Sequence, residues 1–230
     1  MDYPKHVGVI MDGNRRWAKK MNLEPWEGHK AGKETLKKLI NYFLDSKVQY
    51  LTLYSLSLDN FNKRSSIERK HLYEVIKSGF DEIVESDLVK KRKLCIKVIG
   101  KWWLLPEDIK TSIERAIEVT KNNKGKIVTF AICYDGQDEV VEACKEIVKK
   151  GIPTDKINLK VFYENMYSKD LPPVDLIIRT GGEKRLSGFM LWSASYAELY
   201  FTEVLFPDAV PETFELAIKD FSQRKRRFGK

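Results

Sequence analysis

The fold and the main site of this protein are decided by one stretch near its start, His6 to Lys20, which reads HVGVIMDGNRRWAKK. Its first six residues predict a short buried strand. The chain then turns at Asp12-Gly13-Asn14, and a basic, helix-forming segment follows. A helix that begins straight after a strand leaves several backbone N–H groups unpaired, with the positive end of the helix dipole behind them. The stretch therefore predicts an anion site.

The same stretch carries one carboxylate among its cations. Arg15 and Arg16 raise the positive potential of the turn, and Gly13 permits close approach of the backbone to a ligand. Asp12 lies in the middle, where a Mg²⁺ ion shared with a phosphate is the simplest reason for a carboxylate. On its own, the pattern is also compatible with an ordinary tight turn.

Length and composition suit one α/β domain over residues 1–230. Hydrophobic residues make up 43% of the chain, which is typical of a globular protein. The formal net charge of +8 favours polyanionic partners, namely nucleic acid, an anionic membrane or phosphorylated small molecules. A solvated lysine-rich surface explains most of the lysines at least as well.

The cysteines and the N-terminus indicate the compartment. Cys95, Cys133 and Cys144 follow no metal or disulfide spacing, so we expect buried thiols in a reducing environment. The chain begins without a signal-peptide pattern and holds no apolar run long enough to span a bilayer. These features predict a cytoplasmic protein whose contact with membranes is at most peripheral.

Strand-like and helix-like runs alternate along the chain. Strands are expected at 6–11, 49–58, 94–100, 126–134, 174–179 and 198–205. Helices are expected at 16–21, 30–46, from 65 or 66 onward, 106–122, 138–150 and 212–228, with loops around Pro25 and at 59–65 and a short uncertain segment at 157–166. This alternation predicts a mainly parallel central sheet of about six strands, flanked by helices on both faces.

Three unusual loops follow strands, after Met11, Leu58 and Arg179, and they should gather at the edge where parallel sheets bind ligands. The third loop, 179–187, holds two arginines, a Gly-Gly turn and a serine, which can grip a diphosphate. The second loop taken alone fits a solvated loop before a helix. No P-loop motif occurs, which argues against an ordinary nucleotide-binding NTPase.

Several separate motifs, in the right order from His6 to Gly229, resemble those of the cis-prenyltransferases, the undecaprenyl and dehydrodolichyl diphosphate synthase family. The motifs are Met11-Asp12-Gly13-Asn14-x-Arg16-Trp17-Ala18, Gly28-His29-x-x-Gly32, Tyr54-x-x-Ser57-x-x-Asn60, Arg179-Thr180-Gly181-Gly182-Glu183-x-Arg185-x-Ser187, and Tyr196-Ala197-Glu198 followed by Phe206-Pro207. The resemblance implies sequential condensation of isopentenyl diphosphate onto farnesyl or geranylgeranyl diphosphate, which makes a long Z-polyprenyl diphosphate, a precursor of glycosyl carrier lipids.

The resemblance also implies roles for individual residues. Asp12 and Asn60 would be catalytic, and Asp12 and Glu198 would be linked to Mg²⁺. The substrate-binding residues would be Gly13, Asn14, Arg15, Arg16, Trp17, His29, Ser57, Asp59, Arg64, Arg179, Arg185, Ser187, Arg227 and Gly229. The allylic diphosphate would lie near residues 13–16, and isopentenyl diphosphate near Arg179, Arg185 and Ser187. The resemblance also implies a homodimer, in which the C-terminal Arg227-Phe228-Gly229 would reach the site of the neighbouring subunit.

An apolar tunnel should hold the growing product between the sheet and the helices that follow residues 30 and 66. Its expected walls are Leu39, Phe43, Val75, Ile76, Phe80 and Ile83. Some positions depart from the bacterial pattern: no arginine precedes Gly28-His29 near Pro25, and Asp59 and Lys184 replace a glutamate and a histidine. The stretch from Lys63 to Glu68 has one residue more than the bacterial spacing, which affects how the family roles of Arg64 and Glu68 are assigned to this chain.

Two alternatives stand beside this interpretation. A non-catalytic partner subunit of the same family would lack many substrate-binding residues, whereas this chain keeps them. A basic nucleic-acid-binding protein would need a basic stripe with aromatic platforms, and Trp102-Trp103 lacks such a framework. We therefore expect no nucleic-acid partner.

Overall fold

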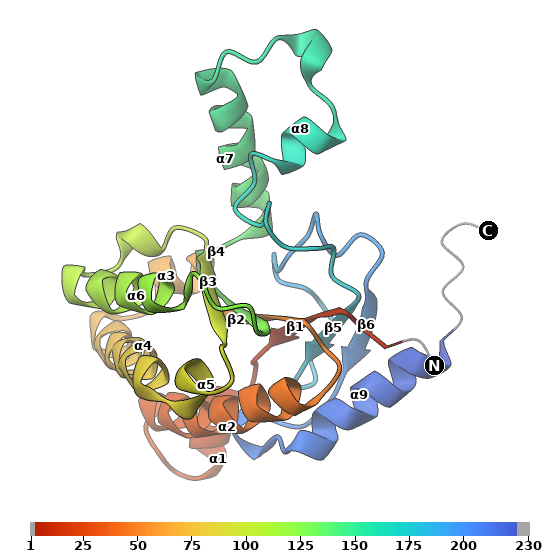
Figure 1. Cartoon of the computed structure of the whole chain (residues 1–230). Coiled ribbons are helices and arrows are strands. Elements are labelled where there is room, and N and C mark those ends of the chain that lie inside the picture. The colour runs from red at the N-terminus through yellow and green to blue at the C-terminus, as the bar shows by residue number, and fades with distance from the viewer. Residues whose placement is uncertain (1–2, 225–230) are drawn as a thin grey trace.

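The structure, a computed structural model, describes residues 3–224 and is built on one six-stranded sheet (Figure 1). The strands are β1 His6–Ile10, β2 Tyr50–Ser57, β3 Cys95–Ile99, β4 Ile127–Tyr134, β5 Leu176–Arg179 and β6 Glu198–Phe201. Their order is β3-β4-β2-β1-β5-β6, and every pairing is parallel. The predicted α/β architecture is confirmed.

β1 lies inside the sheet, between β2 and β5, and all five of its residues are buried. A strand covered on both faces must be apolar throughout, which explains the unbroken run that begins the chain. His6 is the one polar member, and its ring nitrogens meet the Pro172 carbonyl oxygen at 2.8 Å and Thr52 Oγ1 at 2.8 Å. Because β1 is a central strand, the loop that follows it lies near the middle of the C-terminal end of the sheet.

Helices cover the sheet unequally (Figure 1). They are α1 Asn14–Lys20, α2 Pro25–Asp45, α3 Leu58–Lys63, α4 Ser66–Glu85, α5 Asp87–Lys90, α6 Glu107–Thr120, α7 Gly136–Lys149, α8 Leu159–Tyr163 and α9 Pro211–Gln223, with short 3-10 turns η1 Trp102–Leu104, η2 Thr154–Lys156 and η3 Phe206–Asp208. The larger core lies between the sheet and α2, α4, α6 and α9. A smaller core on the other face is closed mainly by the segment 166–199, while α7 and α8 project outward.

Several predicted boundaries were wrong for identifiable reasons. The loop expected around Pro25 is the first turn of α2, because proline is favoured where no intrahelical N–H bond is needed. The polar loop expected at 59–65 contains α3, whose first turn is capped by Ser57 Oγ accepting from the Asn60 N–H. Cys144 is exposed on α7, whereas Cys95 and Cys133 are buried as predicted. The end of the helix expected at 212–228 lies outside the described residues.

Two glycines of α2 allow the start of α1, where the main site begins, to pack closely against α2. A Cβ at Gly28 would lie 2.0 Å from the Asn14 carbonyl oxygen, and a Cβ at Gly32 would lie 2.3 Å from Asn14 Oδ1. Only a glycine surface lets α1 approach α2 this closely. The Asn14 amide meanwhile donates to the Met11 carbonyl oxygen at 3.0 Å, which fixes the turn between β1 and α1.

Alanine at two helical glycines should therefore have opposite effects on stability. Gly28→Ala should lower the free energy of unfolding by about 1–3 kcal/mol because its methyl group has no room. Gly79→Ala, in α4 with nothing within 4 Å of the added Cβ, should raise it by about 0.5–1 kcal/mol. Urea unfolding followed by circular dichroism measures both values. Equal effects would contradict the packing described for α1 on α2.

Candidate active site

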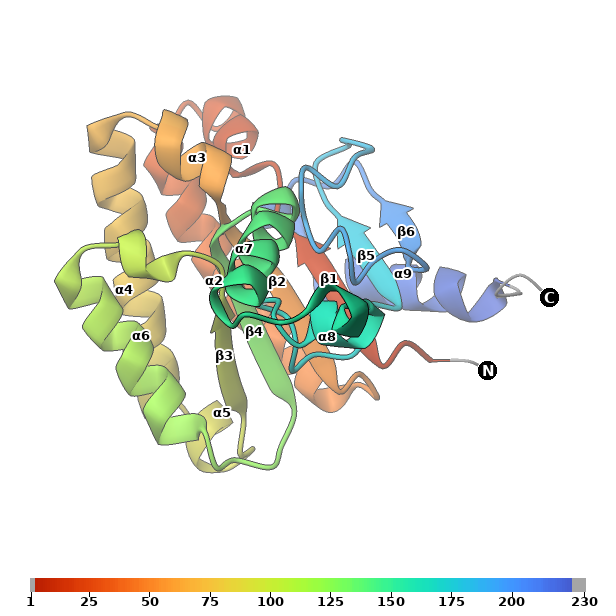
Figure 2. The ribbon, with the colours of Figure 1, turned by 90° about the horizontal axis from the view of Figure 1, so that it is seen from above.

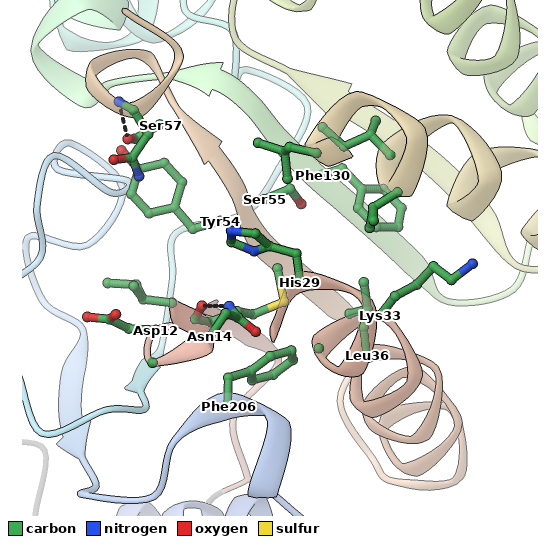
Figure 3. Close-up of a pocket in the computed structure, with 18 of the residues that line it drawn as sticks. Asp12, Asn14, His29, Lys33, Leu36, Tyr54, Ser55, Ser57, Phe130 and Phe206 are labelled. Carbon is green, nitrogen blue, oxygen red and sulfur yellow. Dashed lines mark hydrogen bonds between the residues drawn. The ribbon is translucent and has the colours of Figure 1, made fainter. Parts of the chain in front are cut away.

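A cavity of about 1750 Å³ runs from the loops beyond β1, β2 and β5 into the space between α2 and α4. α1 and α3 lie beyond the same end of the sheet (Figure 2). Polar side chains such as Asp12 and Ser57 line one end, and Leu36 and Phe130 lie toward the other (Figure 3). Ligand sites are commonly about 300–1,000 Å³, so this cavity suits a long molecule with a polar head.

The backbone of Asp12 is fixed from three sides. Its N–H donates to Thr180 Oγ1 at 3.0 Å, and that hydroxyl donates to the Asp12 carbonyl oxygen at 2.7 Å. The Phe206 N–H donates to the same carbonyl oxygen at 3.0 Å. Gly13 follows with a φ of 110°, which glycine adopts without strain, and no side chain caps the first turn of α1. The turn therefore presents helix N–H groups toward the cavity, as an anion site requires.

Arg179 joins the first and third predicted loops. Its guanidinium donates to Asp12 Oδ2 at 2.8 Å, to Ser187 Oγ at 2.9 Å and to the Arg185 carbonyl oxygen. The Arg179 side chain is only 5% exposed, so its geometry is set by packing. Arg16 lies on the other side of Asp12, with Nη2 3.3 Å from Oδ1. Two cations thus hold the Asp12 carboxylate beside the anion site.

A second charged cluster closes the cavity near α3 and α4. Arg64 Nη1 lies 3.2 Å from His29 Nε2, and Arg15 Nε lies 3.6 Å from Glu68 Oε1. Glu68 Oε1 is also 3.6 Å from Arg64 Nε and has no hydrogen-bond partner, so the carboxylate is surrounded by cations without being bonded to them. Burial, and then the charges of Arg64 and Arg15, lower the pKa of His29 to about 3. His29 is therefore neutral at ordinary pH and can accept or donate one hydrogen bond.

Most of the predicted site residues meet in this cavity. Its lining includes Asp12, Gly13, Asn14, Arg15, Arg16, His29, Ser57, Asp59, Asn60, Arg64, Arg179, Arg185 and Ser187. Residues from four separate sequence motifs thus come together at one edge of the sheet. Arg227 and Gly229 lie outside the described residues.

Two predicted residues lie elsewhere in the chain. Trp17 is not part of the lining: its indole N–H donates to Asp208 Oδ1 at 2.7 Å, so it ties α1 to the turn η3. Glu198 is the first residue of β6 and binds Arg224 Nη1 at 2.6 Å. It pairs in register with Leu176, about 10 Å down the sheet from the Arg179 end. Within one chain, Glu198 therefore lies away from Asp12, and its link to Mg²⁺ stays a prediction.

Two expected tunnel walls are wrong. Val75, Ile76, Phe80 and Ile83 line the cavity as predicted, but Leu39 and Phe43 are not part of the lining. α2 instead contributes Leu36 and Ile40 to the cavity, while Leu39 and Phe43 are buried in the larger core. Helical periodicity identified the apolar stripe but not how the helix is rotated about its axis.

Tyr54 is a positioning residue whose role the sequence did not reveal. Its hydroxyl lies 3.1 Å from the carbonyl oxygens of Tyr134 and Ser187, so it fixes the loop that carries Ser187. Ser187 has a φ of 50°, a conformation that needs such support. The motif Tyr54-x-x-Ser57 was visible in the sequence, but the carbonyl groups that Tyr54 meets are more than 70 residues away.

The donors present fit a Mg²⁺ ion that is shared with substrate. Mg²⁺ is commonly held by one or two carboxylates together with substrate phosphates. Asp12, 30% exposed at the polar end of the cavity, offers such a carboxylate. Among residues 3–224, no group of three or more His, Cys, Asp or Glu side chains could hold a metal by itself. An ion here would thus depend on the phosphates for most of its ligands.

The buried His29 should make stability depend on pH. Its pKa in the folded protein, about 3, is below its ordinary value of 6.5, so between these values the unfolded chain binds an extra proton. The stabilisation is complete above pH 6.5 and is lost as the pH falls toward 3, by up to about 1.4 kcal/mol per pH unit. His29→Gln should have a shallower decline of unfolding free energy over this range, measured by urea titration. An unchanged slope would contradict the neutral, buried state of His29.

Comparison with known proteins agrees with the geometry. Residues 10–229 match the family model described as putative undecaprenyl diphosphate synthase. A tritrans,polycis-undecaprenyl-diphosphate synthase (geranylgeranyl-diphosphate specific) of Methanopyrus kandleri is 40% identical, over 99% of this chain and 85% of its own. An isoprenyl transferase of Zymomonas mobilis is 38% identical, over 98% of this chain and 92% of its own.

Solved structures agree as well. Lavandulyl diphosphate synthase from Lavandula x intermedia, in complex with dimethylallyl diphosphate, superposes with a TM-score of 0.94 at 32% identity and 99% coverage of both chains. A probable undecaprenyl diphosphate synthase from Campylobacter jejuni gives a TM-score of 0.83 at 32% identity, with both chains fully covered. None of the helices within residues 3–224 is long and apolar enough to cross a membrane. The chain belongs to the undecaprenyl diphosphate synthase family of cis-prenyltransferases.

Proposed function

We propose that the polar end of the cavity holds two diphosphates side by side and that the apolar part holds the growing hydrocarbon. The chain is a cis-prenyltransferase that joins isopentenyl diphosphate to an allylic diphosphate and makes a Z-polyprenyl diphosphate. The observation that carries the assignment is the guanidinium of Arg179, which joins Asp12 of one loop to Ser187 of the other. The proposed catalytic unit spans residues 1–230.

The allylic diphosphate would lie at the turn that begins α1. Its oxygens would meet the backbone N–H groups after Gly13 and the side chains of Arg15 and Arg16, with His29 and Arg64 beside them. These cations would stabilise the charge that develops on the leaving oxygen as the allylic C–O bond breaks. Bacterial members carry an arginine shortly before the Gly-His motif, and this chain has none near Pro25. Arg15 and Arg64 would supply the diphosphate contact in its place.

Isopentenyl diphosphate would lie beside it, against Arg185, Ser187 and Arg179. Its double bond would attack the allylic carbon as the allylic C–O bond breaks and diphosphate departs. The resulting cation would pass a proton to the released diphosphate, which leaves the cis double bond. Ser57, Asp59 and Asn60 lie at the start of α3 and line the cavity. There they would contact the reacting ends of the allylic diphosphate and isopentenyl diphosphate. A Mg²⁺ ion held by Asp12 and the phosphates would help the diphosphate to leave.

The names of several relatives support a proposal for the primer. The Methanopyrus kandleri protein and those of Sulfurisphaera tokodaii and Pyrococcus abyssi are named as geranylgeranyl-diphosphate specific. We therefore propose geranylgeranyl diphosphate as the preferred primer. Each added prenyl unit would bury apolar surface worth about 0.8 kcal/mol per CH₂, which keeps the intermediate bound between additions.

A homodimer would give Glu198 a role. β6 is an edge strand, and its four residues are only partly buried. A second copy that covers this edge could bring its Glu198 toward the diphosphates of the first, a position that Glu198 does not reach within its own chain.

Asp12→Asn should abolish turnover while the protein stays folded. The change keeps the shape of the side chain but removes the charge that Arg179 and Arg16 hold in place, and kcat should fall by about 100-fold or more. Incubation of the purified chain with labelled isopentenyl diphosphate, geranylgeranyl diphosphate and Mg²⁺ measures the loss. Asp155→Asn, in the exposed turn η2, is the matched control. Near-normal turnover of Asp12→Asn would refute the mechanism.

Mixing two inactive variants tests whether Glu198 acts across subunits. A hybrid of Asp12→Asn with Glu198→Gln holds one site with both changes and one site with neither. Each isolated hybrid should therefore keep about half of the wild-type activity. Co-expression with two different tags, followed by isolation of the hybrid, gives the measurement. A hybrid as inactive as its parents would show that Glu198 does not serve the neighbouring site.

The same assays decide between an enzyme and a non-catalytic partner subunit. The presence of Asp12, Arg179 and Ser187 in one hydrogen-bonded group favours a chain that is active on its own. Inactivity of the pure chain with every primer tested would favour the partner subunit.

A further inference from the structure

The solvent side of the cavity is closed by a line of contacts between α2 and α4. Trp26 stacks on His71 with ring centroids 4.6 Å apart, Lys33 Nζ lies 3.2 Å from Ser78 Oγ, and Lys37 Nζ lies 2.8 Å from Glu82 Oε2. The two residues of each pair are 45 positions apart, so the helices run in the same direction and the contacts follow one seam. We call this line the α2–α4 seam.

The part of the seam that lies beyond Trp26 and His71, toward the C-terminal ends of the two helices, is held by ion pairs. Lys33 Nζ lies 2.7 Å from Glu82 Oε1, so the two lysines of α2 bind both oxygens of one carboxylate of α4. Gly79 of α4 lies between Ser78 and Glu82 in the sequence and has no side chain. A Cβ there would have nothing within 4 Å, so the helix surface is open at this point. Lys37 and Glu82 are each 45% exposed, and ion pairs at such exposure contribute little stability. This part of the seam is therefore easier to separate than a packed core.

Directly behind the seam lies the apolar part of the cavity. Lys33, Lys37 and Glu82 belong to its lining, together with apolar side chains of the same two helices. Figure 3 shows Lys33 reaching away from the polar end, beyond Leu36. Glu82 is about 20 Å along α4 from Glu68, which marks the diphosphate end. A tail that extends along α4 from the diphosphate end therefore reaches these charges.

We propose that Glu82, with Lys33 and Lys37, is a side gate of the cavity that sets product length. This inference rests on the proposed function, because it needs a chain that grows. While the gate is closed, the tail is confined and growth stops when the cavity is full. When the gate opens, the tail passes between α2 and α4 while the diphosphate end stays bound, so further units are added.

Charge reversal tests the gate. Glu82→Lys places a third ammonium group beside Lys33 and Lys37, and only Lys37 then keeps a carboxylate partner, Glu34 of its own helix. The variant should therefore open the seam and shift the product distribution toward longer chains by one prenyl unit or more. The triple variant Lys33→Glu, Lys37→Glu, Glu82→Lys restores opposite charges across the seam and should return the distribution to that of the wild type. Products made from labelled isopentenyl diphosphate, with a nonionic detergent to receive the tail, are separated by chromatography at equal substrate consumption.

The matched control is Glu215→Lys, which removes an exposed ion pair within α9 and changes the net charge equally. It should leave product length unchanged. Wild-type lengths from Glu82→Lys, or a triple variant that keeps the longer products, would overturn the gate. If Glu82→Lys does not fold, Glu82→Gln takes its place, and an unchanged distribution has the same meaning. A wild-type chain that forms no product at all would instead count against the proposed function.

Discussion

The buried guanidinium of Arg179 is the contact on which the active site depends. It lies at the end of β5, beside β1, and it holds Asp12 after one strand and Ser187 beyond the other. A buried arginine without an anion is costly, so Asp12 also stabilises the arginine that positions it. Because the parallel pairing of β1 and β5 sets the distance between the two loops, the sheet itself spaces the two proposed diphosphates.

Carboxylates hold the cations of the site in place. Asp12 lies between Arg16 and Arg179, and Glu68 lies among Arg15 and Arg64. Without them, guanidinium groups gathered for two diphosphates would repel one another. The Glu68 contacts are long and leave one oxygen without a hydrogen bond, so the cations can turn toward a phosphate at small cost. Preorganised cations of this kind need little rearrangement as charge develops on a leaving group.

Local patterns in the sequence predicted the parallel sheet, and the family resemblance predicted most of the polar residues that line the cavity. Apolar runs that alternate with helical stripes specify the strands, and motifs that follow strands must meet at one edge. The remaining features depend on distant contacts. The rotation of α2, which turns Leu36 rather than Leu39 to the cavity, depends on packing across the sheet. The place of Glu198 depends on the register of an edge strand, which no motif encodes.

The cavity has two kinds of wall, and the difference between them affects where a growing product can extend. Toward the sheet, its wall consists of side chains such as Phe130 and Ile132, which are packed into a core where separation would expose apolar surface. Toward solvent, the wall between α2 and α4 includes Lys33 and Lys37, which bind Glu82. Water can solvate these charges when they separate, so this wall opens at the lower cost. An apolar tail that has filled the cavity will therefore press outward between α2 and α4 before it displaces the core.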